Sequence, residues 1–221
     1  MLRKMIRFSS RKVELNQFLR KMFDGSHSQY GEDLIIDKLL NHKPFGFYVD
    51  VGASHPIKFN NTYMFYMRGW NGINIDPNPS SKQAFDVLRS RDINYTLGIA
   101  NKTASMPFYV INESMYSTFS KEEANESVSS GRKIEEVINV KVKKLKDVLD
   151  KINPEHIDFM SIDTEGYDYE VLQSNDWNKY KPTVLCVECH NDSDKINKFL
   201  ERKGYKRVHK ATNSIFVLEG R

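Results

Sequence analysis

Acidic and imidazole side chains gather at the ends of two apolar runs in the second half of the sequence. Asp163 follows the run 157–162, and Glu188 and His190 lie at the end of the run 183–188. If both runs are parallel strands, their carboxyl ends meet at one edge of a sheet, where α/β proteins bind ligands. There the three side chains can act as general bases on a hydroxyl group, or together bind Mg²⁺ or Mn²⁺. The residue types leave both kinds of catalysis open.

A second pair of strand ends indicates a nucleoside-binding site. The run 46–51 contains Asp50 and is followed by Gly52, and the run 72–76 ends in Asp76. A carboxylate at the end of the second strand accepts hydrogen bonds from ribose in dinucleotide-binding proteins. The three glycines that bring a backbone close to a pyrophosphate are missing, so a phosphate-free nucleoside such as S-adenosylmethionine fits better than NAD. The alternative for Asp76 is to cap the helix that follows it.

Strands and helices alternate along the chain, as in a parallel sheet covered by helices. We expect a Rossmann-like α/β fold with a mostly parallel seven-stranded sheet and a C-terminal antiparallel hairpin. The helix after Asp163 also offers that residue and Glu165 a purely structural role as helix caps. The expected strands are 46–51, 72–76, 93–99, 103–111, 137–142, 157–162 and 183–188, and the hairpin is 204–209 with 214–218. One expected helix begins near Pro56, and the others cover 82–89, 144–151, 167–174 and 194–203.

Charge divides the chain into a short basic start and one domain. Residues 1–25 hold seven Lys or Arg against two acidic residues, whereas the remainder is close to neutral. We expect the basic amphipathic segment 1–25 to pack on the domain or on a second copy in a homodimer, or to contact an anionic membrane weakly through residues 1–24. The single domain is expected over 26–221, with the polar stretch 112–132 as a mobile insertion near the substrate.

Apolar runs and cysteine spacing limit location and partners. The longest apolar run, 63–67, is too short to span a membrane or to form a signal peptide, so we expect a cytoplasmic protein. A near-neutral domain disfavours nucleic acid as a partner. Cys186 and Cys189 lie on one expected strand, where residues three apart point to opposite faces, so we expect two buried free thiols.

Five motifs occur in order along the sequence. They are SQYGED at 28–33, YVDVGA at 48–53 with Pro56, NNTY at 60–63, GWNGINIDPNP at 69–79 and IDTEGYD at 162–168. With these motifs the sequence resembles the FkbM family of methyltransferases over about residues 26–218. The resemblance implies a class I methyltransferase fold, S-adenosylmethionine as cofactor, and methyl transfer to a hydroxyl of a sugar, glycan precursor or similar small molecule. It leaves the basic start of the chain unexplained.

The resemblance also implies which residues bind the cofactor. They would be Gln29, Tyr30 and Glu32, which close over it; Asp50, Gly52 and Ala53 at its methionine part; Asp76 at its ribose; and Asn61, Thr62, Pro77 and Glu165.

Two observations favour oxygen as the methyl acceptor over other chemistry. The sequence 163–166, DTEG, lacks the D/N-P-P-Y/F pattern that accompanies methylation of a base amine, and the missing glycines disfavour a nicotinamide oxidoreductase. The rival from another class is a non-catalytic S-adenosylmethionine-binding module in a glycan-assembly complex. Binding without turnover would distinguish that module from an enzyme.

Overall fold

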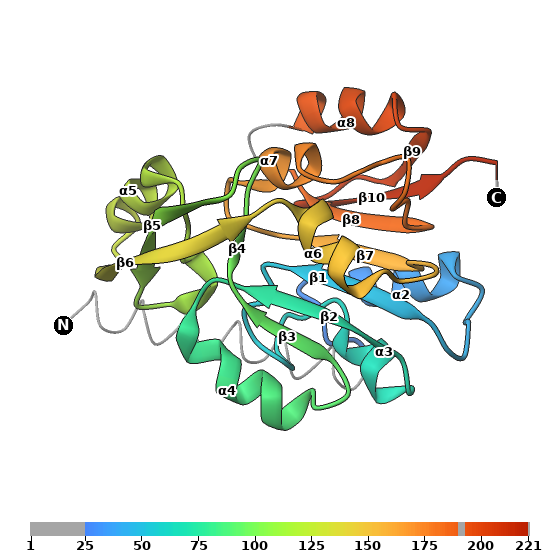
Figure 1. Ribbon diagram of the computed structural model, residues 1–221, viewed down its shortest axis with the longest axis horizontal. Coiled ribbons are helices and arrows are strands. Elements are labelled where there is room, and N and C mark those ends of the chain that lie inside the picture. The colour runs from blue at the N-terminus through green and yellow to red at the C-terminus, as the bar shows by residue number, and fades with distance from the viewer. Residues whose placement is uncertain (1–24, 190–192, 221) are drawn as a thin grey trace.

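The fold is built on a seven-stranded sheet with the order β3-β2-β1-β7-β8-β10-β9 (Figure 1). The computed structural model describes residues 25–189 and 193–220. The neighbours from β3 to β8 run parallel, and β10 is antiparallel to both β8 and β9. This confirms the expected Rossmann-like α/β fold with its C-terminal hairpin. The strands are β1 Phe47–Val51, β2 Asn71–Asp76, β3 Ile93–Thr96, β7 Phe159–Ile162, β8 Val184–Glu188, β9 Tyr205–His209 and β10 Asn213–Leu218.

The strand order reverses between β1 and β7, because β2 and β3 extend the sheet on one side and β8 extends it on the other. In an open parallel sheet this switch point leaves a crevice outside the carboxyl ends of the strands, where ligands bind. The topology therefore directs attention to the loops after β1, β2, β7 and β8. The helices around the sheet are α2 Glu32–Leu39, α3 Tyr63–Met67, α4 Pro79–Leu88, α6 Leu145–Ile152, α7 Asp168–Gln173 and α8 Ser193–Glu201.

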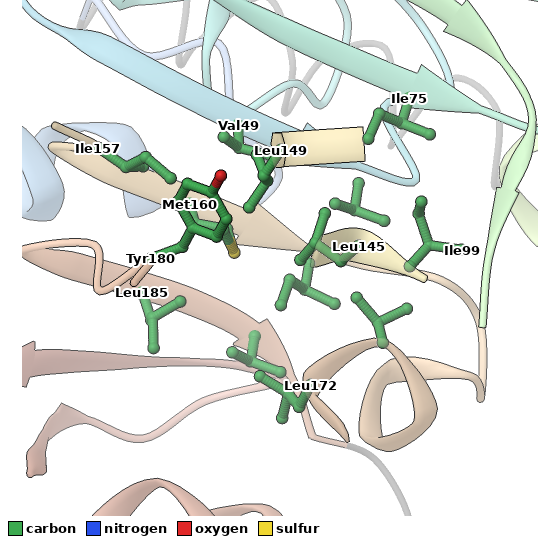
Figure 2. Packing of buried hydrophobic residues seen from close by; sticks show 14 of the residues in the cluster. Val49, Ile75, Ile99, Leu145, Leu149, Ile157, Met160, Leu172, Tyr180 and Leu185 are labelled. Atoms are coloured by element: carbon green, nitrogen blue, oxygen red, sulfur yellow. The ribbon is translucent and has the colours of Figure 1, made fainter. Parts of the chain in front are cut away.

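Helices bury the sheet on one face through a continuous apolar core. Every residue of β7 and β8 is buried, which is why these strands appear in the sequence as mostly apolar runs. Val49, Met160 and Leu185 belong to the cluster in which Leu145 and Leu149 of α6 also lie (Figure 2). The four-residue spacing of the two leucines places them on one side of their helix. This packing fixes the central strands whose ends carry the candidate site.

Aromatic side chains form the core on the opposite face. Phe65 of α3 packs on Phe159 of β7 with ring centroids 5.5 Å apart, and on Trp70 at 5.0 Å. Ile36 of α2 and Tyr48 of β1 belong to the same cluster. The two clusters together hold the sheet between helical layers.

A second, three-stranded sheet stands beside the first and has the order β4-β6-β5 (Figure 1). The strand expected over 93–99 is therefore wrong in one respect: it divides into β3 of the large sheet and β4 of the small one. Residues 93–96 pair with β2, whereas Gly98 and Ile99 pair with β6, and a Cβ at Gly98 would overlap the ring of Phe119. The added strands are β4 Gly98–Ile99, β5 Ala104–Ile111 and β6 Ile134–Lys143.

One expected helix is absent, and the stretch 112–132, expected only as a mobile insertion, contains helical turns. No helix begins near Pro56, because residues 52–62 form a loop and the next helix is α3. The stretch 112–132 contains a short 3-10 helix, η1 Ser114–Tyr116, and α5 Lys121–Ser129. Only Ala124 and Ser127 of α5 are buried, so the sequence has no apolar stripe that would reveal this helix.

The cysteine prediction is confirmed, since both thiols are free and buried. Cys186 lies in the cluster with Phe65 and Phe159, and Cys189 lies in the cluster on the other face. Among the described residues, no helix is long and apolar enough to cross a membrane. The basic segment 1–24 and His190 lie outside the part of the chain that the structure describes.

Candidate active site

The loop after β1 begins at a glycine that the fold requires. Gly52 has a φ of +82°, and a Cβ there would overlap the backbone carbonyl oxygen of Asp163. The N–H of Gly52 donates to the carbonyl of Ile75 at 2.9 Å, and the N–H of Asp163 donates to the carbonyl of Val51 at 3.0 Å. The ends of β1, β2 and β7 are thus in direct contact, and only a residue without a side chain fits between them.

Asp76 ends β2 with its carboxylate held by backbone. Its Oδ2 accepts from the N–H of Ser54 and its Oδ1 accepts from the N–H of Asn78, both at 2.9 Å. The Ser81 hydroxyl, which has one proton, lies 3.0 Å from Oδ1 and 2.8 Å from the carbonyl of Asn78. A carboxylate offers about four acceptor positions, so Asp76 can still accept from a ligand. The capping alternative is wrong, because Asn78 is the N-cap of α4 and accepts from the N–H of Ser80.

Asp76 faces a cavity of about 190 Å³, called here the Asp76 cavity. Apolar side chains of Leu97, Ile99, Phe108 and Phe119 line the wall formed by β4, β5 and the loop after η1. None of the described residues that line this cavity is Lys or Arg. A cavity that combines the carboxylates of Asp76, Asp163 and Glu165 with apolar walls suits a phosphate-free nucleoside, as the missing glycines suggest.

A larger cavity of about 460 Å³ opens beside it and is called here the Glu188 cavity. Acidic side chains outnumber basic ones along its wall, where Lys58 and His55 are the basic ones among the described residues. Burial lowers the pKa of His55, which favours its neutral form. The acidic residues in the wall are Asp50, Glu113, Asp163, Glu165 and Glu188.

The two cavities share part of their lining. Gly52, Asp163 and Glu165 border both, together with Ser114 and Met115 of η1. A group bound in one cavity can therefore reach a group bound in the other across this shared wall. Part of the stretch 112–132 thus borders both cavities, and its role as a mobile insertion near the substrate stays a prediction.

Three carboxylates form a close cluster at the shared wall. Asp163, Glu165 and Glu188 each offer an oxygen, and these oxygens lie within 4.8 Å of one another. Burial raises the pKa of Asp163 well above its usual value, and the neighbouring charge and hydrogen bond of Glu188 raise it further. Burial, with Glu188 again, raises the pKa of Asp168 to about 8. Asp163 therefore holds its proton to a higher pH than an exposed Asp does.

Asp50 lies deep in the Glu188 cavity. Its Oδ2 accepts from the Asn60 amide and the Thr62 hydroxyl, both at 3.0 Å, and no group of the described residues donates to its Oδ1. Burial raises the pKa of Asp50 to about 6, against the effect of Arg89 and these hydrogen bonds. The side chain is ionised above that pH, with one oxygen available to a ligand.

The other expected cofactor residues lie in different places. Gln29, Tyr30, Ala53 and Asn61 line the Glu188 cavity, and Pro77 lines the Asp76 cavity. Neither Glu32 nor Thr62 is among the described residues that line either cavity.

Glu32 and Asp33 support the turn that carries Gln29 and Tyr30. Glu32 accepts from the N–H of Tyr30 at 2.7 Å, and Asp33 accepts from the N–H of His27 at 2.6 Å and the hydroxyl of Ser26 at 2.6 Å. These acids act behind the cavity wall as turn supports.

Several residues of the cavity walls have no signal of their own in the sequence. Ser54, Phe59 and Ser161 are next to motif residues in the sequence, so the motifs indicate the segment but do not identify these residues as part of the wall. Thr212 comes from the turn before β10, and only the folded hairpin brings it to the Glu188 cavity.

The sheet order, with Asp76 at the end of β2 and two joined cavities at the strand ends, is that of a Rossmann-like methyltransferase fold. Comparison with protein families matches residues 50–207 to the methyltransferase FkbM domain. That match covers more than half of the chain, and the protein belongs to this family. No curated protein matches the chain. Membership makes the protein a methyltransferase, and the family implies S-adenosylmethionine as its cofactor.

We predict that Gly52→Ala lowers the free energy of unfolding more than Gly131→Ala does. Both glycines have a φ between +80° and +90°, so both variants carry the cost of about 1–2 kcal/mol for a left-handed alanine. At Gly131 nothing lies within 4 Å of the added Cβ, whereas at Gly52 the backbone of Asp163 must move. We expect an additional loss of about 1–3 kcal/mol, measured by urea unfolding. Equal losses in the two variants would contradict the close contact of β1 with β7.

Proposed function

We propose that the protein transfers a methyl group from S-adenosylmethionine to a hydroxyl of a sugar, a glycan precursor or a similar small molecule. The observation that carries this proposal is the position of Asp163, which borders both cavities and hydrogen-bonds to Glu188. One carboxyl group at the junction can receive the proton that an alcohol must lose as it is methylated.

The cofactor fits the Asp76 cavity and the adjoining part of the Glu188 cavity. Asp76 retains acceptor capacity for ribose hydroxyls, and the apolar wall with Leu97 and Phe108 suits adenine. Asp50 has Oδ1 available for the ammonium of the methionine part, and Gly52 allows close approach of the backbone. When bound, the cofactor supplies a methyl group on a sulfonium sulfur.

The acceptor then occupies the rest of the Glu188 cavity. Tyr30, Phe59 and Tyr116 offer aromatic surface, and Ser161 and Glu188 offer hydrogen-bonding groups. The excess of carboxylates around the cavity disfavours an anionic acceptor, nucleic acid included, and favours a neutral polyol. Aromatic faces combined with carboxylates and hydroxyls match the alternating apolar and polar surface of a sugar.

The chain's contribution to the reaction is alignment and proton transfer. The shared wall at Gly52 and Asp163 holds the two reactants side by side, which converts a bimolecular step into an oriented one. As the new O–CH₃ bond forms and the S–CH₃ bond breaks, the hydroxyl proton passes to the pair Asp163 and Glu188. Burial and the neighbouring acids raise the pKa of Asp163, so its ionised form is a stronger base than that of an exposed Asp. The products are the methyl ether and S-adenosylhomocysteine.

We predict that Asp163→Asn lowers kcat about 100- to 10,000-fold, because Asn has the same size but cannot receive the proton. The affinity for S-adenosylmethionine, measured by calorimetry, should stay within about threefold of that of the unmodified protein. Turnover is measured as S-adenosylhomocysteine released in the presence of a panel of neutral monosaccharides and their glycosides.

The matched control is Asp86→Asn, which removes an exposed carboxylate of α4 that borders neither cavity. It should leave both quantities unchanged. Full turnover by the Asp163 variant would remove Asp163 from the mechanism. Cofactor binding by the unmodified protein without turnover on any hydroxylated acceptor would favour the non-catalytic binding module instead.

The same carboxylates offer an alternative role as metal ligands. The expected set of Asp163, Glu188 and His190 stays a prediction, since His190 lies outside the described residues, while the described set has Glu165 in its place. Three carboxylate oxygens fit the ligand preference of Mg²⁺ or Mn²⁺. The hydrogen bond between Asp163 and Glu188 favours the proton-sharing role.

We therefore predict that EDTA changes the initial rate by less than about twofold. Dialysis against EDTA, followed by assay with and without added Mg²⁺ or Mn²⁺, makes the measurement. Loss of activity that returns only with the added cation would assign the cluster to metal binding.

A cytoplasmic location, a homodimer and membrane contact through residues 1–24 stay predictions.

A further inference from the structure

A fully buried arginine lies behind the loop that joins β1 to α3. Arg89 is the C-cap of α4, and its side chain is 0% exposed. Its Nε donates to Asp92 at 2.9 Å, and the Asp92 side chain is also 0% exposed. Taking a charged pair out of water costs several kcal/mol per ion unless further hydrogen bonds compensate. The remaining N–H groups of Arg89 supply those bonds, and several of them point to the loop.

Arg89 contacts the loop at three places. Its Nη1 donates to the carbonyl of Pro56 at 3.0 Å and lies 3.3 Å from Oδ1 of Asn60. Its Nη2 donates to the Thr62 hydroxyl at 2.9 Å. Thr62 is 0% exposed and Asn60 is 2% exposed, so water does not compete for these bonds. The end of α4 is thereby tied to the loop around the two cavities.

The chemistry of the guanidinium sets the direction of these bonds. An arginine only donates, so the Thr62 hydroxyl that accepts from it must donate its own proton elsewhere. The candidates are Oδ2 of Asp50 at 3.0 Å and Oδ1 of Asn60 at 2.8 Å. The Asn60 oxygen already accepts from Arg89 and from the N–H of Thr62. The Asp50 carboxylate is therefore the better acceptor for the proton of the Thr62 hydroxyl.

A second route reaches the same oxygen. Asn60, whose Oδ1 accepts from Arg89, donates through its Nδ2 to Oδ2 of Asp50 at 3.0 Å. Both routes end on Oδ2, so two donors fix the orientation of the carboxylate and leave Oδ1 for the Glu188 cavity. Bonds that donate to a carboxylate also stabilise its ionised form.

We propose that Thr62 and Arg89 are positioning residues. The hydrogen bonds from Arg89 to Thr62 and from Thr62 to Asp50, called here the Arg89 relay, hold Asp50 ionised with its Oδ1 directed to the cofactor ammonium. This inference rests on the proposed function, which places the ammonium at Asp50. It also gives Thr62, which the resemblance assigned to the cofactor, a role one step behind it.

The charges around Asp50 agree with this role. Burial raises the pKa of Asp50 to about 6 and the charge of Asp76 on β2 acts in the same direction, while Arg89, Thr62 and Asn60 lower it. The Cys186 thiol on β8 also faces Asp50, and burial raises the pKa of that thiol well above its usual value, so it stays neutral. Cofactor affinity should fall as pH drops through about 6, since protonated Asp50 loses its charge.

The test is Thr62→Val, which keeps the shape of the side chain and removes the hydroxyl. We expect the Kd for S-adenosylmethionine to rise about tenfold or more at pH 7.5, because Asp50 loses one of two donors. The pH at which affinity falls should move upward from its value in the unmodified protein. Calorimetry from pH 5.5 to 8.5 gives both quantities on the full chain.

Two variants separate positioning from simple destabilisation. Thr62→Ser restores the hydroxyl and should recover the Kd and the pH profile. Tyr48→Phe removes another hydrogen bond of Arg89, 2.8 Å long, that does not lead to Asp50. It should lower the thermal midpoint without moving the pH profile.

Three outcomes would overturn the relay. One is an unchanged Kd and pH profile in Thr62→Val despite a lowered thermal midpoint, and another is an equal shift of the profile in Tyr48→Phe. In both cases the unmodified protein still binds S-adenosylmethionine, so the proposed function stands. No binding by the unmodified protein at any pH would instead contradict the proposed function and the relay together.

Discussion

The contact between Gly52 and the backbone of Asp163 is the constraint on which the site depends. It exists because β1 and β7 are parallel neighbours at the point where the strand order reverses. Parallel pairing brings their carboxyl ends to the same edge, and the absent side chain at Gly52 lets the two loops touch. Asp50 lies in β1 just before this contact, and the loop after β7 begins with Asp163 of the carboxylate cluster. In the proposed function, cofactor binding and proton transfer therefore share one wall.

Burial raises the pKa of a carboxyl group on each side of that wall, and the neighbouring groups oppose the rise on one side and add to it on the other. At Asp50 it raises the pKa, and the neighbouring cation and hydrogen bonds oppose the rise, which keeps the group charged at neutral pH. At Asp163 the neighbours are themselves acidic and add to the rise, so its pKa lies well above the usual value. A charged carboxylate suits the recognition of an ammonium, and a proton-sharing pair suits an alcohol. One crevice thus holds acids suited to two different tasks.

The sequence predicted the parts of the fold that depend on periodic burial. Strands such as β7 and β8 appear as mostly apolar runs because helices cover both faces of the sheet, and Asp76 follows from its place after β2. Helix α5 was missed because so few of its residues are buried. The division of 93–99 depends on which strands pair with its two halves, β2 with the first and β6 with the second, and only the folded chain reveals these pairings. In the site, the motif positions identify Asp50 and Thr62. Sequence spacing cannot distinguish a residue that lines a cavity from one that lies behind the cavity wall. Arg89 is distant in sequence from the motif residues that it supports.

The central claim is that the cofactor lies across the ends of β1 and β2 with its sulfur beside Asp163. A crystal structure with S-adenosylhomocysteine tests it most directly, because this product carries the same adenosine and amino-acid groups. We predict ribose hydroxyls within hydrogen-bond distance of Asp76, the ammonium at Oδ1 of Asp50, and the sulfur facing the wall shared by the two cavities. Ribose bound away from Asp76, or a ligand that leaves both cavities empty, would contradict it.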